Sequence, residues 1–152
     1  MTKRAMVLVA GGTGYIGTHT TVELIEAGYD VMMVDNLSNS DPSMHSRVEK
    51  IVGLPVPFIN ADSCDRKAMD DIFSEHEIDA VIHFAAFKAV GESVFDPLKY
   101  FDNNLTSLIV VLETMRKHNV NNLVFSSSAT VYGQPCVLPV TEQTPRQKAN
   151  SP

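Results

Sequence analysis

This sequence of 152 residues has few cysteines, only short apolar runs and no excess of basic residues. Its two cysteines, Cys64 and Cys136, form no C-x-x-C pair, so neither a disulfide framework nor a zinc knuckle is predicted. Apolar runs such as residues 5–10 fall far below the roughly 20 residues that cross a bilayer. The 12 Lys and Arg residues against 18 Asp and Glu give a net charge of −6. These features predict a cytoplasmic protein with reduced thiols, and neither nucleic acid nor a membrane surface as its partner.

Two kinds of catalytic site are also missing from the sequence. No G-x-S-x-G segment is present, which excludes the nucleophile elbow of the α/β hydrolases. The five histidines show no metal-ligand spacing, so no metal site is predicted. His83 falls within an apolar run, where a buried, hydrogen-bonded core histidine is the expected role.

Apolar runs of strand length alternate with helix-periodic segments along most of the chain. The composition, 44% hydrophobic and 20% charged, is typical of one globular domain. Gly28 is expected to end the first helix, Asp65 to cap the third and Pro97 to lie in the first turn of the fourth. Strands are predicted at residues 5–10, 31–35, 56–60, 80–84 and 123–127, and helices at 15–27, 43–52, 66–76 and 97–119.

This alternation predicts the α/β class, with a doubly wound parallel sheet of the Rossmann-like type and helices on both faces. Ligands of such sheets bind at the carboxyl ends of the strands. The domain is predicted to span residues 1–130. Residues 131–152 are polar and rich in proline, so they are predicted to be a loop segment, and the sheet is expected to be truncated after its fifth strand.

Residues 11–17 (GGTGYIG) follow the first predicted strand directly and open the first predicted helix, with Gly11, Gly14 and Gly17 at intervals of three. That context allows a tight turn, a close backbone approach to a pyrophosphate and a helix N-terminus directed at its negative charge. The alternative is a glycine-rich turn that binds no ligand. The loop favours a dinucleotide site because a strand precedes it and a helix follows it.

Asp35 lies at the end of the second predicted strand. An acid at this place accepts hydrogen bonds from the ribose of an adenosine. No Arg or Lys occurs in residues 36–46 to neutralise a 2′-phosphate, so NAD is favoured over NADP. A loop aspartate that caps a turn is the alternative.

The remaining strand ends also have polar or small residues. Residues 62–63 would lie at the edge of an adenine or would cap the next helix. In residues 84–86, Phe84 is followed by two alanines, which are small enough to let a ligand pass over the sheet edge. Lys88 is able to reach a ribose or phosphate, although a lone loop lysine is usually solvated. The hydroxyls of residues 126–128 would face the same crevice or would cap backbone groups.

Five segments together resemble a known family. Residues 9–17, 34–39 and 81–85 are similar to the extended short-chain dehydrogenases/reductases. Residues 88–93 (KAVGES) and 125–133 (FSSSATVYG) narrow this resemblance to the UDP-glucose 4-epimerase (UDP-galactose 4-epimerase) family. The resemblance runs through the whole chain in order. Another NAD-dependent sugar-nucleotide epimerase or dehydratase is the alternative within the same fold.

The resemblance implies tightly held NAD and interconversion of UDP-galactose and UDP-glucose through a transient 4-keto sugar, with the hydride held on NAD. Ser128 would assist the proton transfer as a catalytic residue. The implied cofactor-binding residues are Gly11, Gly14, Tyr15, Ile16, Gly17, Asp35, Asn36, Leu37, Ser38, Asn39, Ser40, Asp62, Ser63, Phe84, Ala85, Lys88, Asn103 and Ser126. The implied substrate-binding residues are Lys88, Ala89, Val90, Ser128, Ala129 and Thr130.

The sequence departs from the family at its catalytic base. That base is the tyrosine of a Tyr-x-x-x-Lys motif, and none of the four tyrosines here is followed by lysine at that spacing. In the family the motif begins directly after a Ser-Pro or Asn-Pro pair, and the present sequence stops at Ser151-Pro152. We therefore expect the amino-terminal part of a homodimeric epimerase that is inactive alone. A non-catalytic NAD(H)-binding module is the alternative.

Overall fold

A parallel sheet of five strands forms the centre of the computed structural model, which describes residues 3–149. The strands lie in the order β3-β2-β1-β4-β5, and each pairs in parallel with its neighbours. This order places the switch in winding direction between β1 and β4, as in a doubly wound sheet. The strands are β1 (Met6–Ala10), β2 (Asp30–Asp35), β3 (Phe58–Asn60), β4 (Ala80–His83) and β5 (Asn122–Phe125).

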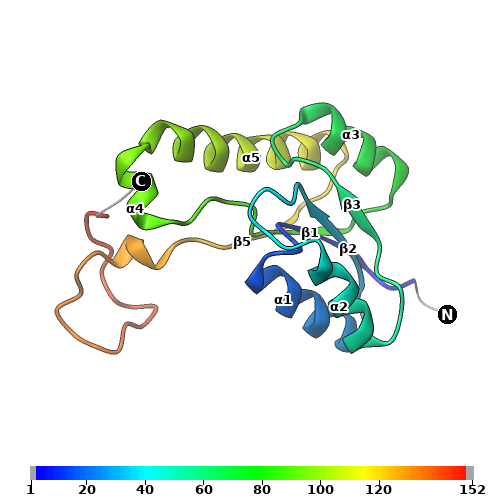
Figure 1. Cartoon of the computed structure of the whole chain (residues 1–152), viewed down its shortest axis with the longest axis horizontal. Coiled ribbons are helices and arrows are strands. Elements are labelled where there is room, and N and C mark those ends of the chain that lie inside the picture. Colours follow the sequence, from blue (N-terminus) through cyan, green and yellow to red (C-terminus); the bar gives the residue numbers. More distant parts are fainter. Residues whose placement is uncertain (1–2, 150–152) are drawn as a thin grey trace.

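Helices cover both faces of the sheet (Figure 1). Helices α1 and α2 lie on one face, where Leu24 and Ile25 of α1 pack against Val7 and Val9 of β1. Helices α3 and α5 lie on the other, where residues of both join the largest hydrophobic cluster. The predicted fold class is confirmed by this layering and by the strand order. The helices are α1 (Tyr15–Glu26), α2 (Ser43–Val52), α3 (Arg66–Glu75), α4 (Val90–Phe95) and α5 (Pro97–Lys117), followed by the 3₁₀ helix η1 (Ala129–Tyr132).

The predicted strands and helices all occur, with ends within two residues of those predicted. The predicted cap of α3 is confirmed, because the Asp65 carboxylate accepts hydrogen bonds from the backbone N–H groups of Lys67 and Ala68. Helix α4 was not predicted. Its sequence, VGESVF, contains glycine and β-branched valines, which have low helix propensity. Tertiary contacts stabilise it instead, since Glu92 of α4 binds Lys99 and Tyr100 of α5.

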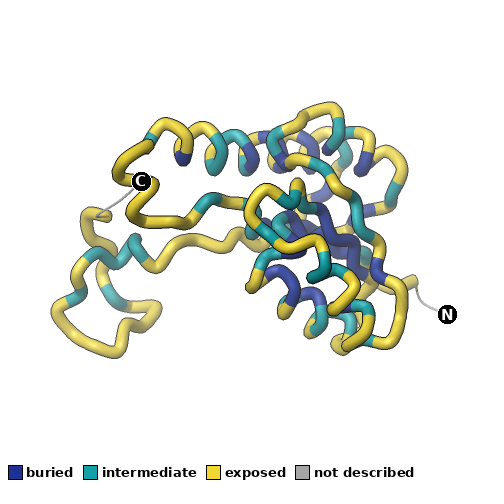
Figure 2. Tube along the Cα trace, viewed as in Figure 1, coloured by how far each residue is buried: buried dark blue, intermediate teal, exposed yellow. Residues whose placement is uncertain are grey.

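The strands differ strongly in burial (Figure 2). Residues 7–10 of β1 and 31–34 of β2 are all buried, as expected for central strands covered on both faces. In β5, by contrast, Val124 is 59% exposed and Phe125 is 49% exposed. The sheet is therefore well covered around β1 and β2 and open at β5.

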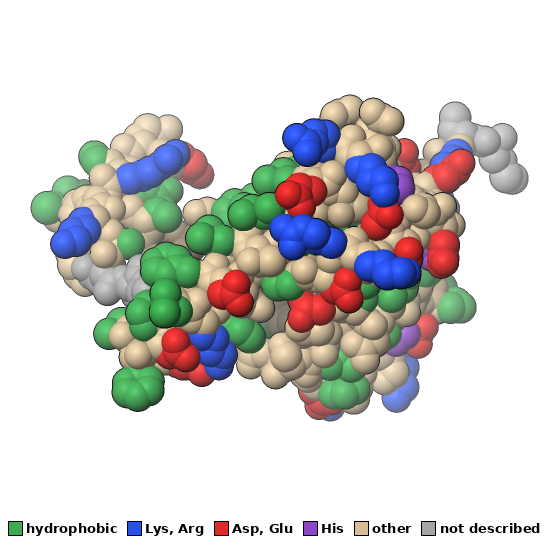
Figure 3. All heavy atoms as spheres, turned by 90° about the horizontal axis from the view of Figure 1, so that it is seen from above, with side chains coloured by type: hydrophobic (Ala, Val, Ile, Leu, Met, Phe, Trp, Pro, Cys, Tyr) green, Lys and Arg blue, Asp and Glu red, His purple; other side chains and the backbone are tan. Residues whose placement is uncertain are grey.

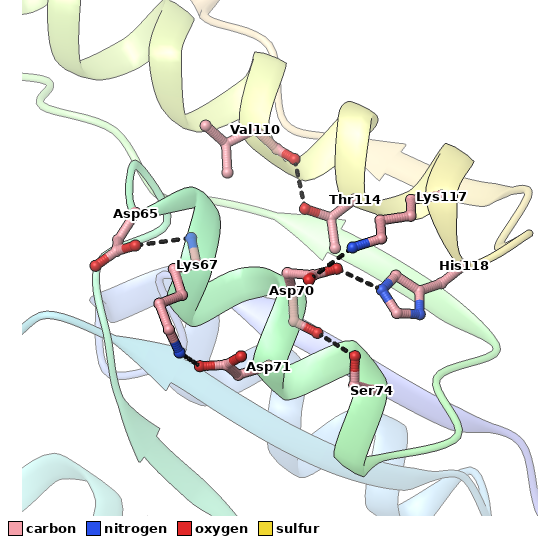
Figure 4. A network of polar contacts seen from close by, with 9 residues as sticks. All are labelled: Asp65, Lys67, Asp70, Asp71, Ser74, Val110, Thr114, Lys117 and His118. Atoms are coloured by element: carbon pink, nitrogen blue, oxygen red, sulfur yellow. Dashed lines mark hydrogen bonds and ion pairs between the residues drawn. The ribbon is translucent and has the colours of Figure 1, made fainter.

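A polar network joins α3 to the end of α5 (Figure 4). The Asp70 carboxylate accepts hydrogen bonds from Lys117 Nζ at 2.7 Å and from His118 Nε2 at 2.8 Å. The bond from Lys117 and then that from His118 hold the pKa of Asp70 below its usual value. This network links the two helices that cover the same face of the sheet. Within residues 3–149, no helix combines the length and hydrophobicity needed to cross a membrane.

Candidate functional site: a cavity along the carboxyl edge of the sheet

A cavity of about 890 Å³ runs along the carboxyl ends of the strands. Its wall includes the glycine loop after β1, Asp35 at the end of β2 and residues 62–63 after β3. It continues past residues 84–88 after β4 to the serines after β5. Its volume lies in the range of ligand-binding clefts, at the place where ligands of doubly wound sheets bind.

Gly11, Gly14 and Gly17 have different reasons to be glycine. Gly11 has φ +77°, and a Cβ there would lie 2.7 Å from the backbone nitrogen of Ala85. At Gly17 a Cβ would lie 2.2 Å from the carbonyl oxygen of Gly11. At Gly14 a Cβ would meet only that same oxygen, at 3.3 Å. Packing within the protein therefore requires glycine at positions 11 and 17, whereas at Gly14 the adjoining space belongs to the cavity.

The N-terminus of α1 faces the same cavity without a side-chain cap. Gly14 is its N-cap residue, and the first turn contains no acidic side chain. The backbone N–H groups at such a helix start have no partners within the helix and, with the helix dipole, attract an anion. The loop and helix therefore form a cradle suited to a phosphate group.

The Asp35 carboxylate is fixed by three hydrogen bonds. Its Oδ2 accepts from the backbone N–H of Thr13 at 3.1 Å. Its Oδ1 accepts from the backbone N–H of Leu37 at 2.9 Å and from the hydroxyl of Ser40 at 3.1 Å. A carboxylate is a pure hydrogen-bond acceptor, so in this orientation it selects for ligand hydroxyls and against ligand phosphates.

Asp62 lies beside Asp35 at the next strand end. It accepts hydrogen bonds from the side chain of Asn36 at 3.0 Å and from the backbone N–H of Cys64 at 2.8 Å. Burial opposes its ionisation, but the bonds from Cys64 and Asn36 outweigh burial and hold the pKa of Asp62 below its usual value. Because Asp65 is the cap of α3, the helix-capping explanation for Asp62 is wrong.

The part of the wall after β4 is held by aromatic and polar contacts. The buried Tyr100 donates a hydrogen bond from its hydroxyl to Glu92 at 2.6 Å. Its ring centre lies 5.7 Å from that of Phe87, and Lys99 Nζ lies over the Phe87 ring, 5.0 Å from its centre. The bond to Glu92, together with burial, raises the pKa of Tyr100. Tyr100 is therefore poorly suited to remove a proton from a ligand.

The segment after β5 presents hydroxyls at the far end of the cavity. The Ser128 Oγ lies 2.8 Å from the hydroxyl of Thr130 and accepts from the Thr130 backbone N–H at 3.2 Å. The later chain returns to this place, because the N–H of Gln147 donates to the carbonyl of Val131 at 3.0 Å. Ala149 consequently lines the cavity close to the serines.

Comparison with known proteins agrees with this geometry. Residues 7–152 match the NAD dependent epimerase/dehydratase family. The chain belongs to this family. It is 54% identical to the UDP-glucose 4-epimerase of Bacillus subtilis over 144 residues, which cover 95% of this chain and 42% of that protein. With the UDP-glucose 4-epimerase of Drosophila melanogaster it shares 51% identity, covering 96% of this chain and 43% of that protein.

Solved structures of relatives share the fold. The UDP-glucose 4-epimerase from Bifidobacterium longum, in complex with NAD⁺ and UDP, superposes with a TM-score of 0.93 at 53% identity. That match covers 97% of this chain and 44% of the other. A relative from Stenotrophomonas maltophila, with bound NAD and formylated UDP-arabinopyranose, gives a TM-score of 0.89 at 49% identity. The chain thus spans less than half the length of the relatives that it matches.

In this family member, nearly all of the predicted site residues come together in one cavity. Leu37, Ala89 and Ala129 are the predicted residues that lie outside its lining. Leu37 instead contributes its backbone N–H to Asp35. The predicted residues that line the cavity are Gly11, Gly14, Tyr15, Ile16, Gly17, Asp35, Asn36, Ser38, Asn39, Ser40, Asp62, Ser63, Phe84, Ala85, Lys88, Val90, Asn103, Ser126, Ser128 and Thr130.

Sequence reasoning missed several residues of the wall. Tyr100, Asn104 and Ser107 of α5 line the cavity together with the predicted Asn103. Their spacing of three to four residues, on a helix that begins at the edge of the predicted site, is a signal that could have found them. His83 is buried as expected, but its Nε2 has no hydrogen-bond partner, so the prediction of a hydrogen-bonded side chain is wrong for that atom. Among residues 3–149, no cluster of His, Cys, Asp and Glu is placed to hold a metal ion.

Proposed function

We propose that this chain is the NAD-binding amino-terminal part of a UDP-glucose 4-epimerase. The observation that supports the proposal best is that one cavity joins a phosphate cradle, a ribose-binding carboxylate and the hydroxyl segment after β5. The whole protein would interconvert UDP-galactose and UDP-glucose, as a cytoplasmic homodimer. Because the chain covers about 42% of its Bacillus subtilis relative, the remaining machinery would come from sequence beyond these residues.

The glycine loop and Asp35 fit the pyrophosphate and the ribose of an ADP group. The open space at Gly14 and the uncapped start of α1 suit a pyrophosphate, which needs close backbone contact. The anchored carboxylate of Asp35 suits the hydroxyls of the adenosine ribose and would repel the 2′-phosphate of NADP. Asn36, Asn39 and Ser40 would support that ribose, and Asp62 and Ser63 would lie at the adenine.

The other end of the cavity suits the nicotinamide half and the sugar nucleotide. NAD, when bound, would take up a hydride from the sugar and return it. The loop after β4 and the segment after β5 supply the surrounding groups: Lys88 as a cation, and Ser126 and Ser128 as hydroxyls. We assign substrate contacts to Lys88, Ala89, Val90, Ser128, Ala129 and Thr130. Phe84, Ala85 and Asn103 would line the cofactor channel between the two ends.

The chain alone is proposed to be inactive because it lacks a proton acceptor for the sugar hydroxyl. Of the described tyrosines, Tyr15 and Tyr100 line the cavity. Tyr100 is engaged by Glu92, which raises its pKa, and neither tyrosine is followed by the lysine that would lower it. Ser128 is able to relay a proton between two partners, but a serine hydroxyl without a neighbouring base is a weak proton acceptor.

A non-catalytic NAD(H)-binding module is the second candidate. The observation in its favour is the complete cradle at the adenosine end beside a catalytic end without a base. Purified chain is analysed by native mass spectrometry with NAD, and its conversion of UDP-galactose is assayed. We expect one bound NAD and no conversion by the isolated chain. Conversion would refute the proposed inactivity, and conversion only when the chain continues into a Tyr-x-x-x-Lys segment would exclude the non-catalytic module.

A further inference from the structure

Thr13 lies inside the glycine loop but lines no part of the cavity, and it is 1% exposed. We propose that Thr13 is a positioning residue: through Ser40, its hydroxyl orients the Asp35 carboxylate toward a ribose hydroxyl of the ligand. This inference rests on the proposed binding of NAD.

The direction of the hydrogen bonds follows from counting protons. The hydroxyls of Thr13 and Ser40 lie 2.7 Å apart, and the Ser40 hydroxyl lies 3.1 Å from Asp35 Oδ1. An ionised carboxylate only accepts, so Ser40 donates its one hydroxyl proton to Asp35. The Thr13 hydroxyl must then be the donor to Ser40. The bonds therefore run in one direction, from Thr13 through Ser40 to Asp35.

Thr13 thereby acts on both oxygens of the carboxylate. Its backbone N–H donates directly to Oδ2 at 3.1 Å, and its hydroxyl acts on Oδ1 through Ser40. Two anchors at opposite oxygens fix the plane of the carboxylate as well as its position. Because Thr13 is buried, water does not readily replace the hydroxyl if it is removed.

The same bonds hold the loop that follows β2. Leu37 has φ +59°, a conformation that is unfavourable for leucine, and its N–H donates to Asp35 Oδ1. Ser40 attaches the far end of the loop to the glycine loop through Thr13. Loss of the Thr13 hydroxyl would therefore loosen Ser40, and with it one of the three hydrogen bonds to the carboxylate and the far end of the loop, at the place where the adenosine ribose is proposed to bind.

The test compares two ligands in two variants, one without the Thr13 hydroxyl and one that retains it. Thr13→Val removes the hydroxyl at nearly constant shape, and Thr13→Ser retains it. Each variant is titrated with NAD and with the NAD analogue that lacks the 2′-hydroxyl of the adenosine ribose. We expect wild type and Thr13→Ser to prefer NAD by roughly tenfold, and this preference to fall to about twofold in Thr13→Val. If Thr13 had a merely structural role, Thr13→Val would lower the affinities for both ligands equally and leave their ratio unchanged.

Thr21→Val is the matched control. Thr21 of α1 is also fully buried, but its hydroxyl has no hydrogen-bond partner. We expect this variant to keep the wild-type preference. Ser40→Ala, which breaks the same series of bonds at its middle, keeps the proposal testable if Thr13→Val does not fold. The double variant Thr13→Val/Ser40→Ala should have the same preference for NAD as Ser40→Ala alone, because both changes interrupt the same series of hydrogen bonds.

The outcomes separate the two levels of the proposal. If the wild-type chain binds NAD and the preference for NAD over the analogue is unchanged in Thr13→Val and Ser40→Ala, the positioning role is overturned and the proposed function stays intact. Failure of the wild-type chain to bind NAD would overturn the proposed function, and the positioning role with it. A preference lost in Thr13→Val and restored in Thr13→Ser supports both.

Discussion

The two ends of the cavity are built in different ways. At the glycine-loop end, backbone lies directly against backbone, residues 7–10 of β1 and 31–34 of β2 are buried, and a carboxylate is fixed by three hydrogen bonds. At the β5 end, the strand is exposed and the wall is held by contacts among long side chains such as Tyr100, Glu92 and Lys99. The first end is complete by itself, whereas the second has few internal constraints.

Exposed hydrophobic residues mark the same difference. They gather over α4 and the first part of α5 (Figure 3), where Phe95 is 91% exposed and Leu98 is 77% exposed. Around β1 and β2 the corresponding apolar side chains are buried. The end proposed for the nucleotide is therefore determined by tight local packing. The end proposed for the sugar depends on surfaces that these residues do not supply.

The largest effect should come from replacing a glycine at the glycine-loop end. Gly17→Ala places a Cβ 2.2 Å from a carbonyl oxygen, so we expect a loss of about 3 kcal/mol or more in the free energy of unfolding. Gly91→Ala in α4 is the control, because a Cβ there meets no atom within 4 Å. It should leave stability unchanged or raise it by up to about 1 kcal/mol. Urea unfolding of both variants measures the difference, and equal curves would contradict the comparison.

Truncation of an apolar side chain should also cost more stability at the glycine-loop end than at the β5 end. Met33 of β2 is fully buried, so Met33→Ala should cost about 2–5 kcal/mol of unfolding free energy. Leu98→Ala, at an exposed position of α5, should change that free energy by less than about 0.5 kcal/mol. Thermal or urea unfolding tests the pair. A large cost at Leu98 would mean that the β5 end is more tightly packed than its exposure indicates.

Gly14→Ala should separate ligand binding from stability. Gly14 has φ −69° and ψ 169°, which alanine also adopts, and an added Cβ would meet only one protein atom at 3.3 Å. We expect the free energy of unfolding to change by less than about 1 kcal/mol. The affinity for NAD should fall by about tenfold or more, since the methyl group would occupy the space of the pyrophosphate. Calorimetry on folded variant checks this, and wild-type affinity would place the pyrophosphate elsewhere.

The smallest effect should be the pH dependence at the α3–α5 contact. Because Lys117 and His118 lower the pKa of Asp70, its contribution to stability is present above the unfolded pKa of about 3.9. That contribution is lost as the pH falls through the folded pKa. Wild type should therefore exceed Asp70→Asn in melting temperature near neutral pH, and the gap should close in acid. A gap that widens in acid would contradict this assignment.

Much of the fold was predictable because its signals are local. The apolar runs that became buried strands, the cap at Asp65 and the glycine loop each depend on residues close together in the sequence. Asp35 was identified in the same way, from its place directly after a strand.

The rest of the fold and of the site depends on contacts between residues that are distant in the sequence, and residue spacing does not reveal such contacts. Helix α4 forms despite poor propensity because Tyr100 and Lys99 hold Glu92. The bond between Thr13 and Ser40 joins positions 27 residues apart. His83 was expected to find a hydrogen-bond partner, and only the three-dimensional surroundings show that its Nε2 has none. Sequence therefore indicates which strand ends meet, but not how their side chains restrain one another.

The most direct test of this account is a calorimetric titration of the 152-residue chain with NAD. The account predicts a single site per chain that binds NAD at least tenfold more tightly than NADP, because the fixed Asp35 carboxylate repels a 2′-phosphate. Absence of binding, or equal affinity for the two cofactors, would contradict it.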